Sequence, residues 1–184
     1  NEGLRRMVAP EISEEIFFDG IEAVVKANID DIPEYGSQKS LYIRPFVIGH
    51  GMNLGVKPSD EYLFSVFCAP VGTYFAGGLQ ALNFVTTDYD RAASNGMGQV
   101  KVAGNYGASL YPRQQALDAG FAGVIYLDPS THSKIDEVGA ANFFGVTYDN
   151  VLVTPKSSSI LPSITRRSIM WIAEHMLGMK TEER

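Results

Sequence analysis

The sequence contains a single cysteine, Cys68, among its 184 residues. An internal disulfide and a cysteine-rich metal site are therefore both excluded. Cys68 lies in an apolar run, residues 63–68, which favours a buried structural thiol over a reactive one. The three histidines (His50, His132 and His175) do not have the spacing of metal ligands, so no metal site is predicted.

Basic residues are also scarce, because 15 lysines and arginines stand against 21 acidic residues and give a net charge of −6. They are scattered along the chain without forming a basic stripe, which argues against a nucleic-acid partner. No apolar run reaches the roughly 18–20 residues that a membrane-spanning helix requires. No secretory signal is recognised either. We therefore expect a cytoplasmic protein that binds neither nucleic acid nor membrane.

Two common enzyme motifs are missing, namely a glycine-rich nucleotide phosphate loop and a nucleophile elbow. The composition, with 45% hydrophobic and 20% charged residues, is that of a globular protein. A chain of this length can form one large domain or two small ones and bury most of its surface.

The hydrophobic pattern predicts a mixed α+β fold in two lobes. Helices are expected over residues 13–28, 104–119 and 165–177, with Ser13 as an N-cap and Gly120 as a C′ residue. Strands are expected over residues 41–49, 62–69, 81–87 and 124–127, followed by a hairpin of 143–147 and 151–153. The glycine-rich segment 70–80 contains a proline and is interpreted as a loop between lobes 1–69 and 81–184.

Lys101 is the first candidate for chemistry. It lies within an apolar run, between Val100 and Val102, and Gly104 and a helical pattern follow. This pattern predicts a strand-to-helix junction, whereas an ordinary surface lysine is the alternative. An amine held at such a junction can form a Schiff base with a carbonyl, which is how pyridoxal phosphate is anchored.

Two residues after Lys101 could meet the ring of that cofactor. Glu137 could face the pyridine nitrogen and keep the ring protonated, although a solvated loop carboxylate is the simpler interpretation. Tyr106, five residues after Lys101, could approach the ring oxygen. A half-buried tyrosine with an ordinary hydrogen bond is the alternative.

The segment 161–166 precedes the last predicted helix. The first amides of a helix have no partners within it and carry the positive end of its dipole, so they can bind a phosphate. The alternative is a plain cap in which Ser163 or Thr165 bonds its own backbone.

Arg44 is a charged residue in an apolar strand, and its burial requires a partner. It could reach a carboxylate such as Asp30 or Asp31. It could instead receive an acidic substrate group, or order site tyrosines such as Tyr42 and Tyr74.

Six segments together resemble the branched-chain amino acid aminotransferases, a family of fold-type IV pyridoxal phosphate enzymes. These segments are residues 40–45, 54–56, 70–75, 101–106, 137–139 and 161–166. The resemblance implies a small α/β lobe and part of a larger pseudo-barrel lobe. It also implies that the chain is a fragment, incomplete at both ends, of a longer enzyme.

The resemblance also assigns roles to residues. Lys101 would be the Schiff-base lysine and carry the α-proton, while Tyr106 and Glu137 would contact the cofactor ring. Leu161, Ile164 and Thr165 would lie at the phosphate. The substrate pocket would be lined by Tyr42, Arg44, Tyr74, Leu54 and Val56. In this family the 54–56 segment reaches into the other subunit, which implies a homodimer.

The family transfers the amino group of leucine, isoleucine or valine to 2-oxoglutarate, in branched-chain amino acid metabolism. A D-amino acid transaminase and an aminodeoxychorismate lyase are alternatives with the same fold. A folded but inactive fragment is another, and we expect the isolated chain to bind cofactor weakly. Ser163 replaces the family's usual glycine, which requires a negative φ at that residue.

Overall fold

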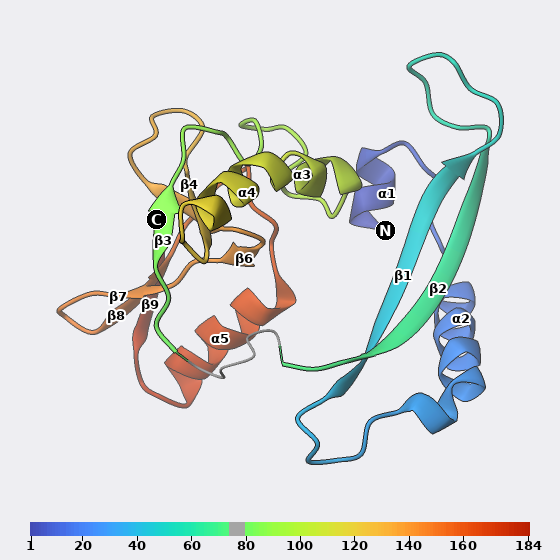
Figure 1. Cartoon of the computed structure of the whole chain (residues 1–184), viewed down its shortest axis with the longest axis horizontal. Coiled ribbons are helices and arrows are strands. Elements are labelled where there is room, and N and C mark those ends of the chain that lie inside the picture. The colour runs from blue at the N-terminus through green and yellow to red at the C-terminus, as the bar shows by residue number, and fades with distance from the viewer. Residues whose placement is uncertain (74–79) are drawn as a thin grey trace. The chain divides into compact units, whose positions relative to one another are not determined.

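The computed structural model describes residues 1–73 and 80–184, and the chain divides into two compact units, Asn1–Gln80 and Ala81–Arg184. The described residues include no helix that is both long and apolar enough to cross a membrane. Figure 1 shows the helices and strands of both units.

The first unit is built on a long antiparallel ribbon of two strands, β1 (Ser40–His50) and β2 (Glu61–Val71). The helix α2 (Glu14–Ala27) packs against this ribbon, where Phe17 stacks on Phe64 with ring centroids 6.4 Å apart. A Cβ atom at Gly20 would lie 3.2 Å from Val66, so the missing side chain lets helix and strand approach closely. The unit also contains α1 (Glu2–Arg6) and the short helix η1 (Ile29–Asp31).

The predicted elements of this unit are confirmed. The hydroxyl of Ser13 accepts a hydrogen bond from the amide of Ile16, so Ser13 caps α2 as expected. Pro45 lies inside β1, opposite Val66. It is tolerated because both strands of a two-stranded ribbon are edge strands.

The second unit contains two small sheets. In the first, β3 (Phe84–Thr86) runs parallel to β4 (Gly123–Leu127), and β5 (Ile135–Val138) and β6 (Ala141–Asn142) continue the sheet antiparallel. In the second, β8 (Val151–Thr154) pairs antiparallel with β7 (Gly145–Val146) and parallel with β9 (Lys180–Glu183). The helices are α3 (Ala103–Gly107), α4 (Leu110–Asp118) and α5 (Ile164–His175).

The core of this unit lies between α4 and β4. Val124 and Tyr126 on β4 and Ala116 on α4 are almost fully buried. Val85 and Phe121 pack around these three residues. Gly120, with φ +86°, ends the α4 turn as predicted, and its left-handed conformation leads the chain directly into β4.

The structure departs from three sequence predictions in this unit. The helix expected over 104–119 is two helices, because the Ser109 hydroxyl donates to the carbonyl of Tyr106 at 2.7 Å at the break between them. The strand expected over 81–87 shortens to β3. The chain before Lys101 forms turns over residues 94–99 instead of a strand. Lys101 therefore follows a turn, and the predicted strand-to-helix junction is not present.

Candidate active site

Lys101 lies just before α3, and its backbone position is fixed by Asn105. The side-chain amide of Asn105 donates to the carbonyls of Met97 and Val100, at 2.8 and 2.9 Å. These bonds hold the turn against the first turn of α3. The backbone position of Lys101 is therefore defined although no strand precedes it.

The Lys101 side chain is exposed and directed at Tyr106. Its Nζ atom donates to the phenol oxygen of Tyr106 at 2.8 Å and lies 5.0 Å from the centre of the ring. Two residues that the sequence singled out separately are therefore in contact. The exposure of the residue leaves the amine accessible to a carbonyl compound.

Glu137 is buried on strand β5, in register with Tyr126 of β4. Its side chain is 2% exposed and forms an ion pair with Arg91, whose side chain is 6% exposed. The interpretation of Glu137 as a solvated loop carboxylate is therefore wrong. A carboxylate can remain in such a site because a cation and further hydrogen bonds replace the lost water.

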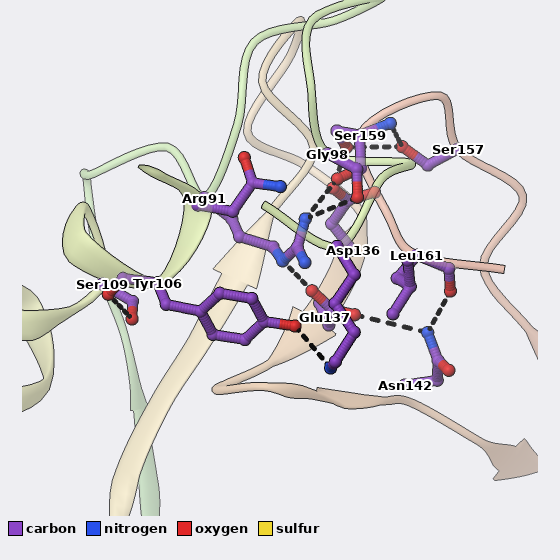
Figure 2. A network of polar contacts seen from close by, with 12 residues as sticks. Arg91, Gly98, Tyr106, Ser109, Asp136, Glu137, Asn142, Ser157, Ser159 and Leu161 are labelled. Atoms are coloured by element: carbon purple, nitrogen blue, oxygen red, sulfur yellow. Dashed lines mark hydrogen bonds and ion pairs between the residues drawn. The ribbon is translucent and has the colours of Figure 1, made fainter. Parts of the chain in front are cut away.

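Arg91 is the main functional candidate that sequence reasoning missed. Its Nη1 atom donates to the carbonyl oxygens of Ser159, at 2.5 Å, and Gly98, at 3.3 Å. Figure 2 shows its guanidinium group between these carbonyls and Glu137, with the Tyr106 ring beside the pair. Burial lowers the pKa of Arg91, and the nearby Tyr106 and Asp136 oppose this effect.

Asn142 is a second residue that the sequence did not indicate. Its side-chain amide donates to Oε1 of Glu137 at 3.3 Å and to the carbonyl of Leu161 at 3.1 Å. It thus connects two residues that were predicted separately as cofactor contacts. The tight hairpin between β5 and β6 turns at Gly139, with φ +58°, and brings Asn142 opposite Glu137. That glycine is the local signal that could have indicated the turn.

The helix α5 begins at Ile164, shortly after Leu161. Ser163 has φ −72° and ψ 142°, so the negative φ required of a non-glycine residue is present. Its hydroxyl accepts from the amide of Arg166 at 3.2 Å. The amides of Ile164 and Thr165, as the first of the helix, have no acceptor within it. A capped helix and a phosphate site are therefore compatible here.

Arg166 anchors this helix end. Its guanidinium donates to the carbonyl of Pro155 at 2.9 Å and to the hydroxyl of Thr154 at 3.3 Å. It also forms an ion pair with Glu183 of β9. The start of α5 is thereby tied to the second sheet.

The predicted substrate residues belong to the first unit. Arg44 donates from Nε and Nη2 to the phenol oxygen of Tyr42, at 3.2 and 3.1 Å. Within residues 1–73 and 80–184 it forms no ion pair, so the expected pairing with Asp30 or Asp31 is not observed. Leu54 and Val56 are fully exposed, and Tyr74 lies outside the described residues.

A family model described as amino-transferase class IV matches residues 1–184. The chain belongs to the class IV aminotransferases. It is similar to the branched-chain-amino-acid aminotransferase of Haemophilus influenzae, with 57% identity over 183 residues that make up 97% of this chain and 53% of that protein. The corresponding protein of Helicobacter pylori is 56% identical over 181 residues, with the same two shares. This aminotransferase chain spans about half the length of the curated relatives it matches.

Solved structures give the same result. The branched-chain amino acid aminotransferase of Escherichia coli superimposes with a TM-score of 0.81 at 29% identity, over 100% of this chain and 59% of that one. A second branched-chain amino acid aminotransferase, solved with pyridoxamine 5′-phosphate, gives a TM-score of 0.80 at 27% identity, over 99% and 58%. The family and the fold-type IV architecture predicted from the sequence are confirmed for this class IV aminotransferase chain.

Proposed function

We propose that the protein containing this chain is a cytoplasmic, pyridoxal phosphate-dependent transaminase. It would transfer the amino group of leucine, isoleucine or valine to 2-oxoglutarate. The observation that carries the proposal is the 2.8 Å contact between the Lys101 amine and the Tyr106 phenol, in the unit that also buries Glu137. The names of the relatives and of the solved structures support the same substrate class.

The described residues of the second unit fit this cofactor. Lys101 offers an accessible amine for its aldehyde, and Tyr106 offers a phenol beside that amine. Glu137 is a buried carboxylate suited to a protonated pyridine nitrogen, and Leu161 is linked to it through Asn142. The amides of Ile164 and Thr165 suit the phosphate.

When bound, pyridoxal phosphate supplies an electron sink for the carbanion formed at the substrate α-carbon. The part of Lys101 would be to receive the proton of the substrate α-carbon on Nζ and to return it at the carbon on the other side of the transferred nitrogen. Tyr106 holds this nitrogen in one direction through its phenol oxygen. Glu137, fixed by Arg91 and Asn142, keeps a negative charge at one place in the site.

The substrate pocket would draw on the first unit. Arg44 and Tyr42 are already held together, so a cation with a fixed phenol is available for an acidic substrate group. By the family resemblance Tyr74 would also line the pocket, while Leu54 and Val56 would reach the site of a second copy in a homodimer. The 2-oxoglutarate carboxylate explains why an apolar pocket would carry an arginine.

The proposal is tested by assaying the full-length protein with L-leucine and 2-oxoglutarate, and with D-alanine as the competing amino donor. We expect transamination of L-leucine, and its loss by several orders of magnitude in the Lys101→Ala variant, because no other amine would hold the cofactor. Activity with D-alanine but not L-leucine would support the D-amino acid transaminase instead. Activity that survives in Lys101→Ala would show that the lysine is wrongly assigned.

A further inference from the structure

We propose that Arg91 is a positioning residue of this site, which keeps Glu137 ionised and joins the three segments that carry the predicted cofactor contacts. This inference rests on the proposed function, because that function identifies these residues as contacts of pyridoxal phosphate. The contacts of Arg91 itself, however, are properties of the chain without any cofactor.

The charge of Arg91 compensates the buried carboxylate of Glu137. Glu137 is one of the most deeply buried side chains among the described residues, and an isolated carboxylate there would be neutralised by a proton. The guanidinium of Arg91 is always protonated under ordinary conditions and lies against Oε2 of Glu137. An opposite charge at contact distance favours the ionised carboxylate. Only an ionised Glu137 can hold a protonated pyridine nitrogen.

Arg91 also connects three separate segments of the chain. The carbonyl of Gly98 lies three residues before Lys101, and the carbonyl of Ser159 lies two residues before Leu161. Arg91 donates hydrogen bonds to both of these carbonyls and forms an ion pair with Glu137 of β5 at the same time. A planar guanidinium with five donors can serve three acceptors in this way, whereas an ammonium on a flexible stem cannot match the geometry.

The backbone around Arg91 is built for this contact. A Cβ atom at Gly98 would lie 1.8 Å from the carbonyl oxygen of Ser159 and 2.7 Å from its Cα, so only glycine fits there. The hydroxyl of Ser159, which is fully buried, bonds Asp136 next to Glu137. Figure 2 shows Gly98, Ser159 and Asp136 gathered on one side of Arg91. The segments before Lys101 and before Leu161 therefore touch where Arg91 bonds them.

The first test measures the charge of Glu137 in the full chain without cofactor. The ¹³C resonance of its carboxyl group, assigned by its disappearance in Glu137→Gln, distinguishes the ionised from the protonated form. We expect an ionised group at neutral pH in the unchanged chain and in Arg91→Lys, and a protonated group in Arg91→Gln. Ser159→Ala is the matched control, since it removes a buried hydroxyl nearby but keeps the carbonyl that Arg91 bonds. Glu137 should stay ionised in that variant.

The second test measures binding of pyridoxal phosphate to the full-length protein by equilibrium dialysis. Arg91→Gln should weaken binding by about tenfold or more, the loss expected when a charge-assisted bond is removed. The same substitution in a Glu137→Gln background should have much less effect, because Arg91 acts through Glu137. The affinity of Arg91→Lys should fall between those of the unchanged protein and of Arg91→Gln, since lysine keeps the charge but lacks the planar, forked donors of the guanidinium.

An ionised Glu137 in Arg91→Gln, or an equal loss of affinity in both backgrounds, would overturn the proposal. If Arg91→Gln does not fold, Arg91→Lys decides: binding equal to that of the unchanged chain would overturn the proposal, and weaker binding with Glu137 still ionised would support it. Failure of the unchanged full-length protein to bind the cofactor would count against the proposed function. The charge measurement would still report on Arg91 and Glu137 in that case.

Discussion

Glu137 and Tyr126 lie opposite each other on neighbouring strands, and both side chains are almost fully buried. The polar atoms of the two side chains differ in their contacts. Glu137 contacts Arg91 and Asn142, whereas the hydroxyl of Tyr126 has no hydrogen-bond partner in the described part of the chain. Burial also raises the pKa of Tyr126, so its hydroxyl stays neutral. The carboxylate is held by specific contacts, whereas the phenol has only its packing and the nearby charge of Arg91.

A Tyr126→Phe variant should therefore be as stable as the unchanged chain, or more stable by up to about 1 kcal/mol. The ring stays in place, and the substitution removes a buried hydroxyl whose lost hydration nothing replaces. Urea denaturation followed by circular dichroism measures the difference in the free energy of unfolding. A loss of more than about 1 kcal/mol would show that the hydroxyl has a partner, and the packing account of Tyr126 would be wrong.

Site residues with an informative local sequence could be predicted. Residues that act through partners far away in the sequence could not. Lys101 and Tyr106 are five residues apart and were each singled out from the sequence, whereas their contact with each other is found only in the structure. Arg91 lies in a polar stretch, residues 88–98, that resembles a mobile loop. Its partner Ser159 is 68 positions away, so no local pattern could reveal the bond.

At the scale of elements, the turn between β4 and β5 is organised by one side chain. The carboxylate of Asp128 accepts hydrogen bonds from the amides of Thr131, Ser133 and Lys134, at 2.8 to 2.9 Å. The hydroxyl of Thr131 donates to it as well. These donors, the amide of Lys134 first, hold the pKa of Asp128 far below its ordinary value.

The depressed pKa makes the stability of the chain depend on acid. An aspartate ionises at about pH 3.9 in the unfolded chain, so the contribution of Asp128 is complete above that pH. It is lost as the pH falls through the lower pKa of the folded state. An Asp128→Asn variant should lower the stability at neutral pH, and its unfolding should take up fewer protons between about pH 4 and about pH 2, by up to about one.

The measurement is the free energy of unfolding by urea at a series of pH values. Asp19→Asn, on the exposed face of α2, makes the same change of charge outside the turn and serves as the control. An identical pH dependence in Asp128→Asn and the unchanged chain would contradict the assigned role of Asp128.

Helices with clear end signals were predicted closely, and the interrupted one was not. Ser13 and Gly120 mark ends that the structure confirms. The break between α3 and α4 depends on the Ser109 hydroxyl competing for a backbone carbonyl. Pro112, in the first turn of α4, is the signal that could have placed the break, because a proline is tolerated in the first turn of a helix and not in its interior.

At the scale of the whole molecule, the pairing of distant strands escaped prediction. Strand β9 joins β8 across α5, and its charged sequence, Lys180–Glu183, has no apolar alternation to reveal it. The mixed α+β class and the family were accessible, because they depend on the order of several short segments. The pairing of β9 with β8 was not.

The proposed homodimer gives a prediction at this scale. Leu54 and Val56 are fully exposed apolar residues in the loop between β1 and β2, as expected of residues covered by a second copy. In the full-length protein, Leu54→Asp with Val56→Asp should shift the mass measured by sedimentation equilibrium from dimer to monomer. Leu110→Asp, another exposed apolar residue, is the control and should leave the dimer intact. A monomeric unchanged protein would contradict the proposal.

The central claim is that the Lys101 amine, and no other, condenses with the aldehyde of pyridoxal phosphate. Borohydride reduction at stoichiometric cofactor, followed by peptide mass mapping, tests it directly. The account predicts one added pyridoxyl group, on the peptide that contains Lys101, and none in Lys101→Arg. A label on another lysine, or labelling spread evenly over the exposed lysines, would contradict it.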